Sequence, residues 1–154
     1  MQPVRYRLAV FDFDGTLADS FPWLAGVVNR LAEKHGFRAV DEAEIERLRD
    51  FDSRRILEFL GVPAWRLPWI ARDARRLMNR ELDGIRLFPD VRDALHELSE
   101  RGVTLAIVSS NSARNVRGVL GSPTADLIDH YQCSVGLFGK RRKLRRVLRR
   151  SGVP

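Results

Sequence analysis

The stretch LAVFDFDGTLADS, residues 8–20, decides how the rest of the chain is interpreted. Its first four residues are apolar without a break, which predicts a strand that is buried on both faces. Asp12 and Asp14 follow this strand directly, and Gly15 then allows a sharp turn. A buried strand that runs into two carboxylates and a glycine is typical of a polar site at the end of a sheet.

The composition is that of one folded domain, or of a core with an insertion, in 154 residues. A hydrophobic fraction of 44% is enough for a packed core, and no apolar run approaches the roughly 20 residues that span a bilayer. Cys133 is the only cysteine, which excludes a disulfide framework, and the N-terminal segment has no signal-peptide pattern. We therefore expect a cytoplasmic protein with no membrane partner.

The net charge is +7, from 27 basic and 20 acidic residues, and the basic residues are mostly arginine. Such a chain suits anionic substrates or nucleic acid. Because the charges are spread over several segments, a solvated arginine-rich surface is the favoured interpretation, and residues 140–150 fit an amphipathic helix with an arginine face. We expect no nucleic-acid partner, and keep a non-catalytic module that binds RNA or an acidic partner as an alternative.

Strand and helix patterns alternate along the chain, which indicates an α/β fold with a parallel sheet. The block from residue 20 to residue 84 contains helical patterns alone and resembles an insertion after the first strand. Apolar runs predict strands at residues 5–11, 103–108 and 133–138. Helices are predicted over residues 21–35, around residues 45–51, from a cap at Ser53 to Gly61, from Pro68 to Gly84, and over residues 89–101, 113–121 and 139–152.

Asp12 and Asp14 lie where ligands bind in open parallel sheets, at the carboxyl end of a strand. Strand alternation predicts that their side chains point to the same side and that Phe13 points to the other. Two close carboxylates repel each other, and a hard cation such as Mg²⁺ is the usual remedy. Together with Gly15 and the hydroxyl of Thr16, they suggest chemistry on a phosphate. A simple Asp-Gly turn is the alternative.

Three stretches in this order resemble motifs of the haloacid dehalogenase superfamily, which is dominated by Mg²⁺-dependent phosphatases. DFDGTLADS, residues 12–20, resembles motif one, AIVSSNS, residues 106–112, resembles motif two, and LFGKRRKL, residues 137–144, resembles the region of the motif-three lysine. The resemblance implies the phosphatase branch with a helical cap, as in phosphoglycolate-phosphatase-like enzymes. The expected domains are a Rossmann-like core, residues 1–19 and 85–154, and a helical cap, residues 20–84.

The resemblance also implies roles for the two aspartates. Asp12 would attack phosphorus and form an aspartyl-phosphate. Asp14 would act as general acid toward the leaving group and then as base toward water. Both would contribute to the Mg²⁺ site, Asp14 through its backbone carbonyl. The expected function is hydrolysis of a small phosphorylated metabolite, with a phosphomutase of the same superfamily as an alternative.

Thr16, Ser109, Ser110 and Lys140 are the expected phosphate-binding residues. The Ser109 hydroxyl and the Ser110 amide would hold phosphoryl oxygens at the start of the helix that follows. Lys140 would neutralise the phosphate and Asp12. Lys143 is a competing motif-three lysine, and the two serines could also simply end a strand and cap a helix.

Motif four of the superfamily, an acidic cluster on the next strand, would follow the final stretch RRSGVP, residues 149–154. We therefore expect the sequence to be part of a longer phosphatase, with a naturally short homologue as the alternative. Without motif four, the chain is expected to bind Mg²⁺ weakly and to show little or no turnover. Residues 8–11 would form an exposed sheet edge through which the chain could self-associate.

Overall fold

The computed structural model describes residues 6–134, 136 and 139–152 of the chain. The chain divides into two compact units, which we call the helical unit, Ser20–Glu81, and the sheet unit, Met1–Asp19 with Leu82–Pro154. The helical unit ends before the sequence-based boundary at residue 84. Leu82–Gly84 forms a turn of 3₁₀ helix that packs against α6 (Ala113–Leu120) and so belongs to the sheet unit.

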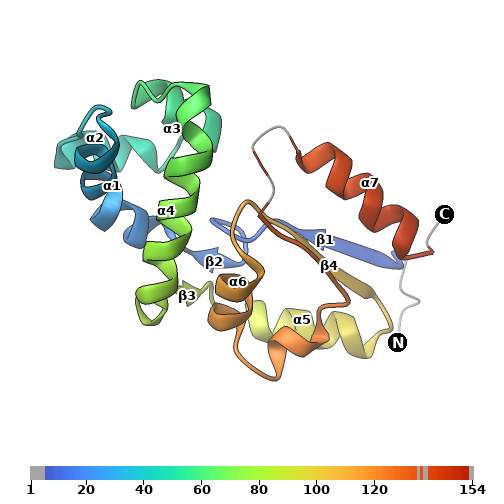
Figure 1. Cartoon of the computed structure of the whole chain (residues 1–154). Helices are drawn as coiled ribbons and strands as arrows, with labels where there is room; N and C mark the ends of the chain where they lie inside the picture. Colours follow the sequence, from blue (N-terminus) through green and yellow to red (C-terminus); the bar gives the residue numbers. More distant parts are fainter. Residues whose placement is uncertain (1–5, 135, 137–138, 153–154) are drawn as a thin grey trace. The chain divides into compact units, whose positions relative to one another are not determined.

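The sheet unit is built on a parallel three-stranded sheet in the order β1-β4-β5 (Figure 1). The strands are β1 (Leu8–Phe11), β4 (Thr104–Val108) and β5 (His130–Gln132). Phe11 pairs with Ile107, and Val108 pairs with Gln132, so all three strands end at one edge of the sheet. Among the described residues β1 has only β4 as a neighbour, and self-association through its other edge stays a prediction.

Helices cover both faces of this sheet (Figure 1). On one face, Val147 of α7 (Lys140–Arg150) is fully buried and forms an apolar cluster with Ala106 and Val108, against which Leu8 and Val10 pack. On the other face lie α5 (Val91–Glu100) and α6, which precede and follow β4 in the chain. The α/β class with a Rossmann-like core is therefore confirmed, because the parallel sheet lies between two layers of helices.

A short antiparallel ribbon carries the chain out of the sheet unit and back. Its strands are β2 (Ala18–Asp19) and β3 (Arg86–Leu87), and the amide of Phe88 adds a hydrogen bond of 3.0 Å to the carbonyl of Leu17.

The helical unit contains α1 (Phe21–His35), α2 (Glu42–Leu48), α3 (Ser53–Phe59) and α4 (Leu67–Arg80), with a 3₁₀ turn at Ala64–Arg66. The predicted helix over residues 21–35 is confirmed, and Gly36 ends it with a left-handed φ of 62°. Val28, Val40, Leu48 and Leu60 form the buried cluster of this unit. Helices α1, α2 and α3 hold together because apolar residues of each pack into this cluster.

Two predicted helix boundaries are wrong. Asp52, and not Ser53, caps α3, because Asp52 has extended backbone and its carboxylate accepts a hydrogen bond of 2.8 Å from the amide of Arg55. The helix that contains Pro68 ends at Arg80, whereas Gly84 lies in the separate 3₁₀ turn.

The third predicted strand is also wrong. It was expected at residues 133–138, of which 135, 137 and 138 lie outside the described residues, whereas β5 is His130–Gln132. The sequence of β5 is polar, but its side chains are accommodated in the fold. Gln132 is buried, and the hydroxyl of Tyr131 donates a hydrogen bond of 2.6 Å to the carbonyl of Ala125. After β5 the chain leaves the sheet, and Ser134 takes a left-handed φ of 54°.

Candidate active site

The predicted site residues gather at the edge where the three parallel strands end. Asp12 follows β1, Ser109 follows β4, and the amide of Ser109 donates to the carbonyl of Gln132 at 3.1 Å. This bond continues the β4–β5 ladder by one residue and fixes Ser109 beside the end of β5. The sheet register therefore brings together residues that lie far apart in the sequence.

Asp12 is held by a backbone donor and by a lysine. Its Oδ1 accepts a hydrogen bond of 2.9 Å from the amide of Phe13, and its Oδ2 forms an ion pair with the Nζ of Lys140. Lys140 is the first residue of α7, and both side chains are partly open to solvent, at 40% for Asp12 and 48% for Lys140. Lys143 has no ion pair among the described residues, so the geometry favours Lys140 as the lysine of the site.

The turn after Asp12 is anchored by a buried aromatic ring. Phe13 is fully buried, and its carbonyl accepts hydrogen bonds from the amides of Thr16, Leu17 and Ala18. Gly15 has a φ of 72°, a left-handed conformation that favours glycine. Thr16 lies exposed on this turn, and the expected role of its hydroxyl in phosphate binding stays a prediction.

Asp14 has a different neighbour from Asp12. The side-chain Nδ2 of Asn111 lies 3.3 Å from both carboxylate oxygens of Asp14. Since β1 ends at Phe11, Asp14 lies beyond the regular strand, and its backbone forms an isolated bridge with Ala18. Asp12 thus faces a full positive charge, whereas Asp14 faces an amide dipole.

Asn111 is a residue that the sequence reasoning missed, and it links the strand ends to each other. It is 4% exposed, its amide donates to Ser109 Oγ at 2.9 Å, and its Oδ1 accepts from Asn115 Nδ2 at 2.9 Å. Its carbonyl also accepts a hydrogen bond of 2.6 Å from the amide of Ser134. A buried amide satisfied on every side fixes the loop that carries it. The sequence signal that could have identified Asn111 was its position in SSNS, residues 109–112, directly after a buried strand.

The two serines of this loop lie in different environments. Ser109 is fully buried, whereas Ser110 is exposed. The cap of α6 is Ser112, whose Oγ accepts from the amide of Asn115 at 3.1 Å, so Ser110 lies two residues before the helix cap. The alternative that Ser110 caps the helix is therefore wrong, and the phosphate-binding roles of both serines stay predictions.

Cys133 lies beside these groups, but its thiol is poorly suited to act as a nucleophile. Its pKa is raised to about 11, mainly by burial, while the charges of Arg117 and Lys143 lower the pKa and the charge of Asp14 raises it. At neutral pH the thiol stays protonated, and the thiolate is the reactive form. Cys133 is therefore not a candidate nucleophile.

Comparison with known proteins identifies the family of the chain. A model of the haloacid dehalogenase-like hydrolases matches residues 9–153. The chain belongs to this family. The assignment confirms the resemblance that the three motifs indicated, and it applies to the sheet unit and the helical unit together, because the match includes both.

Curated proteins similar to this chain include phosphoglycolate phosphatases, of which two illustrate the match. The one from Synechococcus elongatus is 33% identical over 144 residues, which cover 93% of this chain and 68% of the relative. The one from Vibrio cholerae is 32% identical over 127 residues, which cover 74% of this chain and 55% of the relative. The chain therefore spans between about half and two thirds of the length of these relatives.

Solved structures share the fold at low sequence identity. A Lactobacillus plantarum protein superimposes with a TM-score of 0.77 at 21% identity and covers 97% of this chain, which in turn covers 73% of it. CbbY from Rhodobacter sphaeroides, solved in complex with phosphate, has a TM-score of 0.71 at 23% identity, with coverage of 97% and 74%. No helix in the described part of the chain is long and apolar enough to cross a membrane.

Proposed function

We propose that the protein hydrolyses a phosphate monoester of a small metabolite, with Asp12 as the nucleophile. The observation that carries this proposal is the solvent-accessible pair of Asp12 and Lys140 at the edge where the parallel strands end, in a haloacid dehalogenase-like hydrolase. A carboxylate with an adjacent lysine can attack an electrophile and can also tolerate the negative charge of a phosphate.

The reaction has two steps that share one intermediate. In the first step an oxygen of Asp12 bonds to phosphorus, the bond from phosphorus to the ester oxygen breaks, and Asp14 donates a proton to that oxygen. In the second step Asp14 takes a proton from water, the water oxygen bonds to phosphorus, and the bond to Asp12 breaks. The products are an alcohol and inorganic phosphate, and both aspartates return to their starting states.

The surroundings of the two aspartates suit this division of work. Lys140 places positive charge beside the oxygen of Asp12 that would approach a phosphate. Asn111 Nδ2 lies 3.3 Å from both carboxylate oxygens of Asp14 and would orient this carboxyl group for proton transfer. The hydroxyls of Thr16 and Ser109 and the amide of Ser110 would complete the contacts to phosphoryl oxygens.

Mg²⁺ fits the donor atoms of this edge. The structure describes no cluster of three or more His, Cys, Asp or Glu side chains, but Asp12 and Asp14 offer the oxygen ligands that Mg²⁺ prefers. Asp12 would bind through its carboxylate and Asp14 through its backbone carbonyl, with water and phosphate oxygens as further ligands. When bound, the ion would neutralise charge on the phosphoryl group.

The first substrate to test is phosphoglycolate, because the curated relatives are named for its hydrolysis. The assay measures phosphate release from phosphoglycolate and from a panel of sugar phosphates, with and without Mg²⁺. Mass spectrometry of acid-quenched samples locates the phosphoryl adduct, which reports the first step even when overall turnover is slow. We expect the adduct on Asp12.

The decisive variant is Asp12→Asn, which preserves size but cannot form the acyl phosphate. We expect it to lower turnover by at least about 10³-fold and to remove the adduct. The matched control is Asp93→Asn, an exposed aspartate of α5 that has no place in the proposed site. Wild-type turnover in Asp12→Asn, or an equal loss in Asp93→Asn, would overturn the assignment.

A further inference from the structure

Helix α7 carries a dense arginine surface on the side that does not face the sheet. Apart from Leu144, Val147 and Leu148, every one of its 11 residues is lysine or arginine. Val147 is fully buried against the sheet. At 3.6 residues per turn, the half of the helix opposite Val147 carries five arginines, all of them exposed: Arg141, Arg142, Arg145, Arg146 and Arg149. We call these five residues the α7 arginine face.

Within the described residues, no arginine of the α7 arginine face forms an ion pair with an acidic residue, whereas several arginines of the helical unit do. Among the described residues, the one ion pair of α7 is that of Lys140 with Asp12. In the helical unit, by contrast, Arg30 pairs with Glu81 at 3.0 Å, and Arg54 pairs with Glu58 at 2.9 Å. Like charges one helical turn apart destabilise a helix, and this cost falls when an anion binds between them.

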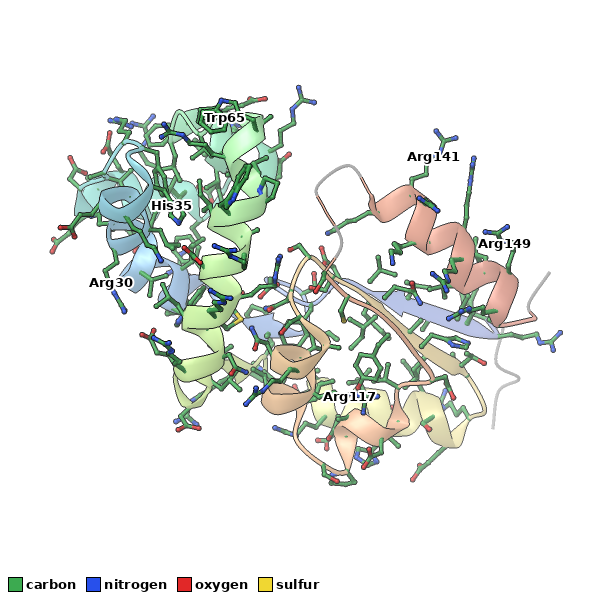
Figure 2. The ribbon with its side chains drawn as sticks, in the orientation of Figure 1. Arg30, His35, Trp65, Arg117, Arg141 and Arg149 are labelled. Atoms are coloured by element: carbon green, nitrogen blue, oxygen red, sulfur yellow. The ribbon has the colours of Figure 1, made fainter. Side chains whose placement is uncertain are left out.

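The face is also hollowed. A groove of about 710 Å³ is lined by Arg141, Arg142, Arg145, Leu148 and Arg149. Figure 2 shows the side chains of Arg141 and Arg149 extending outward from opposite ends of the helix. The groove therefore lies along α7 on its outer side, and four of its five lining residues carry a guanidinium group.

The spacing of the charges favours a regular polyanion. Arg141, Arg145 and Arg149 lie four residues apart, which separates their Cα atoms by about 6 Å per step along the helix axis. Guanidinium groups bind phosphate oxygens in a bidentate manner. A membrane surface fits less well, because Val147 packs against the sheet and only two apolar side chains of α7, Leu144 and Leu148, are exposed beside the arginines.

The residue types that α7 lacks limit the way in which it could recognise a nucleic acid. Within α7 there is no aromatic ring on which an unpaired base could stack, and no Asn or Gln to read a base edge. Contacts would therefore go to phosphates, which position a protein on nucleic acid without reading its sequence. A duplex offers the higher density of phosphates, with one charge per about 1.7 Å of helix axis.

We propose that the α7 arginine face binds the phosphodiester backbone of double-stranded nucleic acid without sequence preference. This interaction is separate from the proposed hydrolysis, since the residue of α7 that pairs with Asp12 is Lys140, which does not belong to the α7 arginine face. Binding depends on released counterions, so the dissociation constant should rise steeply with salt.

The experiment measures fluorescence anisotropy of a labelled 20-base-pair duplex of mixed sequence, as DNA and as RNA, against the 154-residue chain at 50–200 mM KCl. We expect a Kd of about 10 µM or tighter at the lowest salt and a plot of log K against log salt with a slope of about −4. Single-stranded DNA, polyglutamate and vesicles with anionic phospholipid serve as competitors. Comparison of the DNA and RNA duplexes shows which source of phosphodiester is preferred.

The decisive variant replaces three arginines in one row, Arg141→Gln, Arg145→Gln and Arg149→Gln. The magnitude of the slope should decrease by about 2 to 3, because each arginine that contacts a phosphate releases about one counterion. The matched control removes the same charge from exposed arginines of the helical unit that have no ion pair among the described residues, Arg47→Gln, Arg76→Gln and Arg80→Gln. Glutamine is a good helix former, and circular dichroism checks that both variants fold.

Three outcomes would overturn the proposal. Equal losses in the variant and in its control would show that net charge, and not the α7 arginine face, drives binding. Competition by polyglutamate or by vesicles at the same phosphate or carboxylate concentration would assign the face to another class of partner. A Kd above about 100 µM at 50 mM KCl would show no useful affinity for duplexes.

Discussion

The described part of the chain contains two lysine–aspartate ion pairs, and they differ in burial. In the sheet unit, Asp12 and Lys140 are both partly exposed. In the helical unit, Asp73 lies 2.7 Å from Lys34, and the side chain of Asp73 is only 8% exposed. His35 lies 3.1 Å from the same oxygen of Asp73. The same two residue types, lysine and aspartate, therefore form a solvent-accessible ion pair in the sheet unit and a buried link between α1 and α4 in the helical unit.

The partners of Asp73 change its acidity. The hydrogen bond from Lys34 lowers the pKa of Asp73, and burial opposes this shift. The charges of Lys34, Arg72 and His35 lower the pKa further. Since the ionised carboxylate holds two helices together, we interpret Asp73 as structural. The accessible carboxylate of Asp12 can instead exchange its lysine contact for a ligand, which is what a nucleophile requires.

The largest expected effect on stability is that of Asp73→Ala. It should lower the free energy of unfolding of the helical unit by about 2 kcal/mol, because His35 and Lys34 lose a charged acceptor. The three tryptophans of the chain, Trp23, Trp65 and Trp69, all lie in this unit, so their fluorescence in urea reports its unfolding. Asp50→Ala, at an exposed position, is the control, and equal midpoints for both variants would contradict the structural role.

A smaller loss is expected in the sheet unit for Asn111→Ala, at about 1.5 kcal/mol. The substitution leaves Asn115 Nδ2 and the amide of Ser112 without their acceptor, Asn111 Oδ1. Amide hydrogen exchange in β4 measures the stability of this unit independently of the tryptophans. Unchanged exchange in β4, with Asp93→Ala as the reference, would show that Asn111 does not fix the strand ends.

The pH dependence of the helical unit should follow Asp73. The folded state lowers its pKa, so its contribution is fully present above the unfolded pKa, about 3.9, and is lost as pH falls through the lower folded value. Urea midpoints by tryptophan fluorescence at several pH values from 7 to 3 should fall more in the wild type than in Asp73→Asn. Parallel curves for the two proteins would contradict the assignment.

The smallest effect is expected for the exposed pair. Lys140→Met should change the free energy of unfolding by about 0.5 kcal/mol or less, because partly exposed ion pairs contribute little. Hydrogen exchange in β4 gives the measurement. A loss as large as that of Asp73→Ala would remove the distinction between an accessible and a structural pair.

Much of the fold could be predicted because its signals are local. The apolar run before Asp12, the helical stripe of residues 21–35 and the stop at Gly36 depend on neighbours within a few residues. The element β5 could not be predicted in this way. Its residues His130–Gln132 are polar, and they form a strand because β4 lies beside them and pairs with their backbone.

The site shows the same division. The sequence by itself placed Asp12 and Asp14 after a buried strand and identified the family, because short motifs in a fixed order can be recognised without knowledge of tertiary contacts. The tertiary structure decided that Lys140 meets Asp12 and that Asn111 holds Asp14. These contacts join residues about 100 or more positions apart, and only the register of the sheet and the packing of α7 bring them within hydrogen-bonding distance.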